Sequence, residues 1–255
     1  MADGQKSEPP GRNSMATLEI QKHIKDLTSS DYAVRDHSVT QLEKFGKPAA
    51  EALVNRLLTR GVSHDLLRSF EDAFEEIGRP CVDALMGGLD RVPEIRKAED
   101  VYLIELFAET LGHLGRGDAK IAEQLEKLNK RVRQNHARLL TDTCIAAKVR
   151  IHVALAGIDS RRGLDDLLTM LGDGRRRLPD GLVAALERVG DKRALLPLTR
   201  LYTIEEAVTF SGALAIKGTL RDILRREKLG TKDRVFKEFN PEERAQFDKL
   251  VGWGK

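Results

Sequence analysis

Histidine is the residue type in this chain with the most chemical uses, because it can bind a metal or transfer a proton near neutral pH. The six histidines are His23, His37, His64, His113, His136 and His152. None is followed by glutamate, and no two lie three or four positions apart, the spacing that puts two metal ligands on one face of a helix. We therefore interpret them as ordinary helix or surface residues, and we expect no metal, no cofactor and no catalytic residue.

The two cysteines, Cys81 and Cys144, both lie within apolar helical patterns. Cys81 follows Arg79 in the first turn of an expected helix, where a nearby cation could favour the thiolate. It also occupies the position that Ala49 holds in a repeated phrase, so we favour a small buried packing residue, and we assign Cys144 to the core. This cysteine usage is typical of a reduced protein. Since no apolar run approaches a membrane span either, we expect a cytoplasmic protein.

Basic residues in the second half of the chain could contact phosphate groups. The net charge of the chain is +3, but residues 1–115 carry −6 and residues 116–255 carry +9. An aligned edge of Lys and Arg can follow a phosphate backbone. The candidates for phosphate contact stand near the ends of expected helical pairs: Arg161, Arg162, Arg175, Arg176, Arg177, Lys192 and Arg193. We favour the competing interpretation that these residues bind helix carbonyls or only solvate the surface, because acidic residues such as Asp165 and Asp173 lie among them.

A repeated helical unit must position these residues. The phrase GKPAAEAL at residues 46–53 returns as GRPCVDAL at residues 78–85, 32 residues later. The glycine can adopt the left-handed conformation that closes one helix, and the proline has the φ that the first turn of the next helix needs. In two later hinges, at Gly117-Asp118 and Gly190-Asp191, aspartate replaces proline and is expected to cap the second helix. A duplicated phrase at this period indicates stacked helical pairs.

The units are similar to HEAT repeats, and specifically to the bacterial HEAT-like repeats of the phycobilisome lyase type. The residues that carry this resemblance are Val34-Arg35, Leu42 and Gly46-Lys47-Pro48 in one unit, and Leu186, Val189, residues 190–195 and Leu198 in another. The resemblance covers roughly residues 16–228. It implies an all-α fold, a right-handed α-solenoid (superhelix) of HEAT-like helical hairpins. Residues 1–15 are then expected to be a disordered N-terminal arm, and residues 229–255 a charged C-terminal tail or cap.

Helical periodicity divides the repeat region further. We expect a lead helix near residues 16–28, helix pairs near 31–60, 63–91, 93–132, 135–172 and 176–203, and a long helix near 205–228. In related solenoids the second helix of each pair lines the inner surface. The resemblance therefore suggests a partner-binding face made by polar positions of the second helices: Asn55, Arg91, Lys127, Lys130, Arg131, Asp166 and Arg200.

We expect a non-catalytic scaffold or adaptor that binds an unidentified protein partner. The alternative is a nucleic-acid-binding module that uses the basic edge. A HEAT-like enzyme is less favoured. Deoxyhypusine hydroxylase holds two irons with repeated His-Glu pairs, which are missing here. HEAT-like DNA glycosylases use an aromatic clamp, but the one tryptophan is Trp253 and the three tyrosines are far apart. Nothing in the sequence marks a bilin pocket, and no small-molecule substrate is evident.

Overall fold

A computed structural model of the chain describes residues 12–92, 98–136, 142–172, 181–203 and 210–253. These residues form α-helices and short 3-10 helices, and none of them forms a β-strand. The chain divides into two compact units, residues 1–93 and 94–255. No described helix combines the length and the apolar content that a lipid bilayer requires of a spanning segment. The predicted all-α class is confirmed for the described residues.

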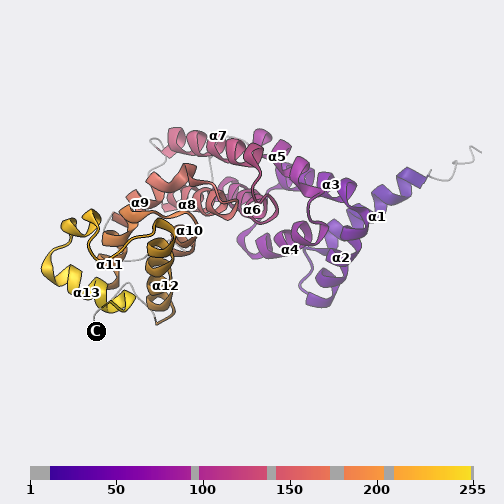
Figure 1. The fold of residues 1–255 in the computed structure, drawn as a ribbon. Helices are drawn as coiled ribbons and strands as arrows, with labels where there is room; N and C mark the ends of the chain where they lie inside the picture. Colours follow the sequence, from indigo (N-terminus) through magenta and orange to yellow (C-terminus); the bar gives the residue numbers. More distant parts are fainter. Residues whose placement is uncertain (1–11, 93–97, 137–141, 173–180, 204–209, 254–255) are drawn as a thin grey trace, which may run out of the picture. The chain divides into compact units, whose positions relative to one another are not determined.

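The first unit consists of five α-helices among its described residues (Figure 1). They are α1 (Arg12–Asp26), α2 (Tyr32–Phe45), α3 (Lys47–Arg60), α4 (Leu67–Ile77) and α5 (Cys81–Arg91). Alternate helices pack together, α2 on α4 and α3 on α5, while α1 contacts both α2 and α3. The largest side chains with an exposed fraction of at most 2% are Ile24, Leu27, Leu42, Leu53, Leu57, Phe70, Phe74, Leu85 and Leu89. The core of this unit therefore lies between the two rows of helices.

The two Gly-Pro hinges have the predicted backbone geometry. Gly46 and Gly78 have φ values of +55° and +73°, and each N–H bonds to a carbonyl of the helix that it ends. Pro48 lies in the first turn of α3, and Pro80 directly precedes α5. A side chain at either glycine would strain the backbone, which explains why both copies of the phrase begin with glycine.

The second unit contains eight α-helices within its described residues (Figure 1). They are α6 (Ala98–Leu114), α7 (Ala119–His136), α8 (Asp142–Gly157), α9 (Leu164–Gly172), α10 (Leu182–Val189), α11 (Leu195–Thr203), α12 (Phe210–Glu227) and α13 (Pro241–Val251). One row of contacts joins α6, α8, α10 and α12, and a second joins α9, α11 and α13. The aspartates of the later hinges act as predicted, since Asp118 and Asp191 each accept a backbone N–H at 2.9 Å two residues ahead.

Helices α6 and α8 approach each other closely at three small residues. A Cβ atom added to Gly112 of α6 would lie 2.7 Å from Cα of Ala154 in α8. A Cβ added to Gly157 would lie 3.0 Å from the carbonyl oxygen of Gly112. Only small residues permit this separation, so the glycines set how tightly the two helices pack.

Residues 229–253 fold onto the end of the second unit. Asn240 and Glu243 form a capping box that starts α13, as the sequence Asn-Pro-Glu-Glu suggests. Phe247 of α13 packs with Phe236 and Trp253 at ring-centroid distances of 5.1 and 5.6 Å. Because α13 contacts α11 and α12, this aromatic cluster covers the apolar end of the helical rows.

Candidate functional site

A groove of about 600 Å³ lies between α1 and α3 in the first unit. Its lining residues are Gln21, Ile24, Lys25, Thr28, Ala52, Asn55, Arg56, Thr59 and Arg60. We call it the α1–α3 groove. All its charged lining residues are cations, namely Lys25, Arg56 and Arg60, and none of the described residues that line it is acidic.

Helical periodicity explains why these side chains share one groove. In α3, residues Ala52, Asn55, Arg56 and Thr59 follow the spacing of one helix face. The opposite face of α3 is apolar, with Leu53 and the other residues of its stripe fully buried against the rest of the unit. The packing of α1 beside α3 adds Lys25 to the lining, together with Ile24, which is only 2% exposed. The two helices therefore bring three cations to one groove, and Ile24 is already covered by their packing.

The cations of the groove have no carboxylate of their own among the described residues. Arg56 donates from Nη1 to the carbonyl oxygen of Gly61 at 3.3 Å. The side chains of Lys25 and Arg60 have no hydrogen-bond or ion-pair partner among the described residues. Burial, and then the like charge of Arg60, lower the pKa of Arg56. Both effects disfavour the charged guanidinium, and an incoming anion would offset them.

Two predicted partner-binding residues meet beside this groove. Nη1 of Arg91 in α5 donates to Oδ1 of Asn55 in α3 at 3.0 Å, although the residues are 36 positions apart. Arg91 also donates from Nε to the carbonyl oxygen of Gly87 at 3.3 Å. The exposed guanidinium thus extends the basic surface from α3 onto α5.

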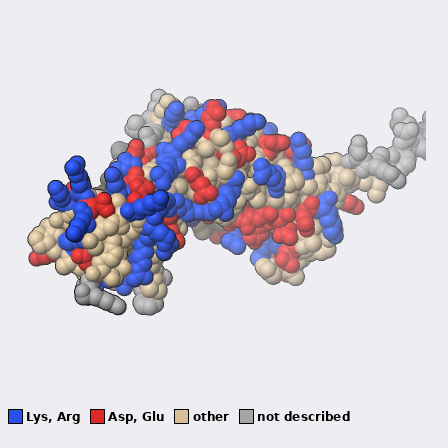
Figure 2. Space-filling model, in the orientation of Figure 1, with Lys and Arg blue, Asp and Glu red and all other residues tan. Residues whose placement is uncertain are grey.

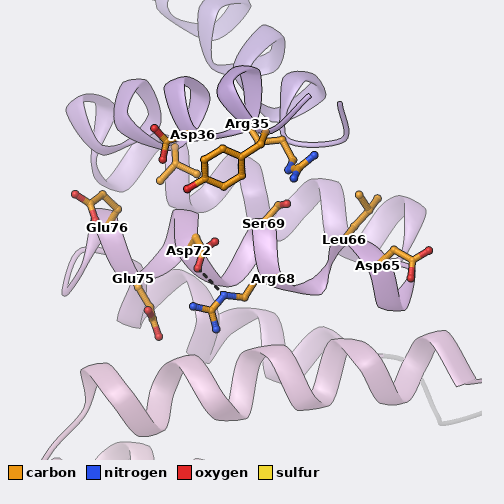
Figure 3. A pocket seen from close by; sticks show the side chains of 11 residues that line it. Arg35, Asp36, Asp65, Leu66, Arg68, Ser69, Asp72, Glu75 and Glu76 are labelled. Atoms are coloured by element: carbon orange, nitrogen blue, oxygen red, sulfur yellow. Dashed lines mark ion pairs between the residues drawn. The ribbon is translucent and has the colours of Figure 1, made fainter. Parts of the chain in front are cut away.

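A second groove in the same unit has the opposite charge (Figure 3). It measures about 530 Å³ and lies on α2, α4 and the short 3-10 helix before α4. Its lining residues are Tyr32, Arg35, Asp36, Val39, Asp65, Leu66, Arg68, Ser69, Asp72, Glu75 and Glu76. Nε of Arg68 lies 3.0 Å from Oδ1 of Asp72, so one of its two arginines is already paired. Acidic side chains gather over α4 on the face that Figure 2 shows.

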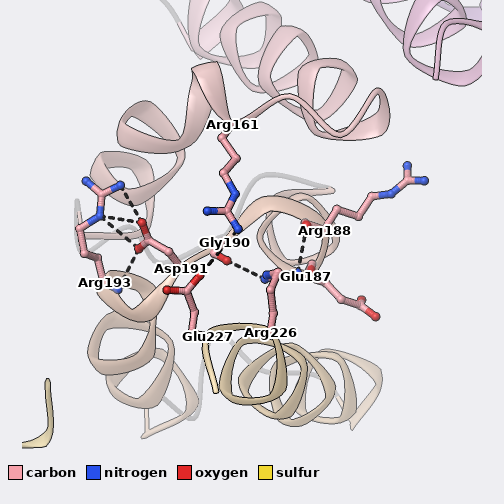
Figure 4. Close-up of polar contacts among 8 residues, drawn as sticks. All are labelled: Arg161, Glu187, Arg188, Gly190, Asp191, Arg193, Arg226 and Glu227. Atoms are coloured by element: carbon pink, nitrogen blue, oxygen red, sulfur yellow. Dashed lines mark hydrogen bonds and ion pairs between the residues drawn. The ribbon is translucent and has the colours of Figure 1, made fainter. Parts of the chain in front are cut away.

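Three of the four predicted phosphate-contacting residues that the structure describes are engaged in ion pairs. Arg162 lies 2.9 Å from Glu126, and Arg193 lies 2.7 Å from Asp165 and 2.9 Å from Asp191. Arg161 lies 3.6 Å from Glu227 (Figure 4). Lys192 is exposed, and Arg175, Arg176 and Arg177 lie outside the described residues. Acidic neighbours therefore compensate Arg161, Arg162 and Arg193, and these three residues remain a prediction as phosphate contacts.

Arg226 binds helix carbonyls, and Arg193 binds the carboxylate of Asp191 (Figure 4). Arg226 donates from Nη1 to the carbonyl oxygens of Glu187 and Arg188 at 2.8 and 3.0 Å, and from Nη2 to Gly190 at 2.6 Å. At Asp191, burial acts to raise the pKa, but the hydrogen bonds and charge of Arg193 outweigh it and hold the pKa below its usual value. These arginines connect successive helical pairs.

The predicted partner-binding residues of the second unit lie in different environments. Lys127 and Lys130 are exposed on α7, with Lys127 3.1 Å from Glu123, and Arg131 is partly buried. Arg200 pairs with Glu243 of the final helix at 2.8 Å. Asp166 lies 3.0 Å from Nε2 of His152. These five residues remain a prediction as partner-binding residues.

Asp166 belongs to a polar network in the interior of the second unit. His152 of α8 has an exposed fraction of 0%, and Asn129 of α7 donates to Oδ2 of Asp166 at 3.3 Å. A Cβ atom at Gly163 would lie 2.5 Å from Nδ1 of His152, so the glycine makes room for the imidazole. The contact joins three helices and was not apparent in the sequence, where His152 reads as an ordinary helix residue.

The interpretation of Cys81 as a packing residue is confirmed. Its side chain is 0% exposed, and Sγ lies 3.6 Å from the carbonyl oxygen of Phe74. Burial raises the pKa of the Cys81 thiol to about 12, which keeps it protonated. The side chains of Cys144 and His136 lie outside the described residues.

No protein-family model and no curated protein matches this chain.

Proposed function

We propose that this chain is a HEAT-like repeat protein whose helical pairs form a right-handed solenoid and that it acts as a non-catalytic scaffold for another protein. Support for the repeat architecture comes from the alternate packing within each unit and from polar contacts between successive helical pairs. Arg91 contacts Asn55, Arg162 contacts Glu126, and Arg226 contacts Gly190, each across 36 residues, while Arg193 and Arg200 contact acids 28 and 43 residues away. Separations near one unit length are expected when successive repeats of unequal length stack on one another.

The α1–α3 groove carries the functional part of the proposal. It lies on α3, a second helix of a pair, where HEAT-like proteins bind their partners, and it presents cations that no described carboxylate neutralises. The predicted nucleic-acid alternative has less support, because Arg161, Arg162 and Arg193 of the basic edge are paired with acids. A polyanion would have to displace these carboxylates before it could bind there.

Affinity purification of the full chain from its native cells, with and without nuclease, tests this proposal. We expect a stoichiometric protein that survives nuclease and that binds the purified chain again in a separate reconstitution. Recovery of nucleic acid alone, or loss of every partner on nuclease digestion, would refute the scaffold and favour the nucleic-acid module.

A further inference from the structure

We infer that the α1–α3 groove is the docking site for a short acidic segment of the partner protein, whose carboxylates pair with Lys25, Arg56 and Arg60. This inference rests on the proposed scaffold function and specifies the chemistry of its partner.

The groove cations have no carboxylate neighbour among the described residues, and they differ from other unpaired arginines such as Arg79 in sharing one groove. Arg68 in the same unit lies 3.0 Å from Asp72, and Arg193 and Arg200 in the second unit lie 2.7 and 2.8 Å from carboxylates. Arg56 and Arg60 have no such neighbour among the described residues, although both line one groove. Two guanidinium groups side by side repel each other, and a carboxylate between them would turn this repulsion into attraction.

The hydrogen-bonding groups of the walls also favour an anion. The hydroxyls of Thr28 and Thr59 donate within their own helices, to the carbonyls of Lys25 and Asn55, both at 2.7 Å. Their protons are therefore already used. The donors that remain available are the N–H groups of the three cations and the side-chain amides of Gln21 and Asn55, so the groove offers a ligand charged donors together with two neutral amides.

The net charge of the first unit also favours a short acidic segment over a long polyanion. The first unit has a net charge of −3, and its second groove, on α2 and α4, is lined by five carboxylates and two arginines. A long polyanion needs many basic contacts and would be repelled by this acidic surface. A short segment needs only the local field of the three cations.

Fluorescence anisotropy with the full chain and a fluorescein-labelled decaglutamate peptide tests the inference. We expect the double variant Arg56→Gln/Arg60→Gln to bind the peptide about tenfold more weakly than the unchanged chain. The matched control is Lys44→Gln/Arg79→Gln, which removes two exposed positive charges from the same unit outside the groove. This control should retain affinity within about twofold.

Three results of the anisotropy experiment would overturn the inference: no binding of decaglutamate to the unchanged chain, equal weakening in the control variant, or tighter binding of a single-stranded 20-nucleotide DNA that the groove variant abolishes. Circular dichroism establishes that each variant is folded. If the double variant does not fold, the exposed single variant Lys25→Gln replaces it, with the same expected direction. The nuclease experiment separates the two proposals, since a stoichiometric protein partner that still binds Arg56→Gln/Arg60→Gln keeps the scaffold and removes only the groove assignment.

Discussion

Replacing Gly112 by alanine should destabilise the second unit, even though alanine forms helices better than glycine. Gly112 lies inside α6 where this helix meets α8. An alanine Cβ would lie 2.7 Å from Cα and 3.2 Å from the carbonyl oxygen of Ala154. Both are backbone atoms, so no rotamer change can remove the clash, and the two helices must separate.

The expected size follows from two opposing contributions. Glycine to alanine in a helix interior stabilises by about 1 kcal/mol. Overpacking a well-filled contact destabilises by about 1–3 kcal/mol, and here the upper end applies because the clash is with backbone. Separating α6 from α8 also loosens packing around buried residues such as Phe107 and Ile151. The net effect should be a loss of about 1–2 kcal/mol in the free energy of unfolding.

Gly218→Ala is the matched control. Gly218 lies inside α12 of the same unit, and a Cβ there would meet no atom within 4 Å. Without a clash only the helix propensity changes, so this variant should gain about 0.5–1 kcal/mol. The two identical substitutions thus have opposite expected signs.

Urea and thermal unfolding followed by far-ultraviolet circular dichroism would measure both variants. Each kcal/mol should move the melting temperature by about 2–4 °C for a unit of this size. Gly112→Ala should lower it and Gly218→Ala should raise it. If Gly112→Ala is as stabilising as Gly218→Ala, the close helix crossing does not exist and the reasoning fails.

Three further predictions concern single groups and one surface. Cys81, with its pKa raised to about 12, should not react with Ellman's reagent at pH 8 until urea unfolds the protein; rapid labelling of the native chain would contradict its burial. The pKa of Asp191 in the folded protein lies below its usual value of 3.8. The ionised side chain therefore stabilises the fold above pH 3.8, and this stabilisation is lost as the pH falls through the folded pKa. Asp191→Asn should therefore be less stable than the unchanged chain at neutral pH, with the difference in urea midpoint shrinking below pH 3.8; a constant difference would refute the linkage. Charge reversal of three basic residues on α7, Lys127, Lys130 and Arg131, should weaken partner binding in the pull-down without lowering the melting temperature. Unchanged binding would show that these residues do not contact the partner.

The helix boundaries at the Gly-Pro hinges were predictable because the rules that set them act over a few residues, whereas α1 begins at Arg12, earlier than the expected start near residue 16. Gly46 ends one helix through its own positive φ, and Pro48 favours the start of the next regardless of distant contacts. The expected pair at residues 31–60 accordingly matches α2 and α3 closely. The same locality explains the capping box at Asn240, where four consecutive residues contain the whole signal.

The groove was only partly predictable. Asn55 and Arg91 were expected on the binding face, because polar positions of the second helices follow the helical period. Arg56 and Arg60 were missed, although they lie on the same face at a spacing of four. Lys25 could not be added from the sequence, because its place depends on how α1 packs against α3, and periodicity within one helix carries no information about that contact.

Net charge proved a poor guide to where positive charge is available. The first unit, at −3, contains the groove whose cations have no carboxylate partner among the described residues, while the second unit, at +6, pairs Arg162, Arg193 and Arg200 with acids. These pairs connect residues 28–43 positions apart, so they form only when the helical rows stack. Among the described residues of the second unit, a basic residue near a helix end is thus often paired with an acid from another helix. In the first unit, Lys25 joins Arg56 and Arg60 because α1 packs beside α3, although α1 also carries Glu19 and Asp26, which do not line the groove.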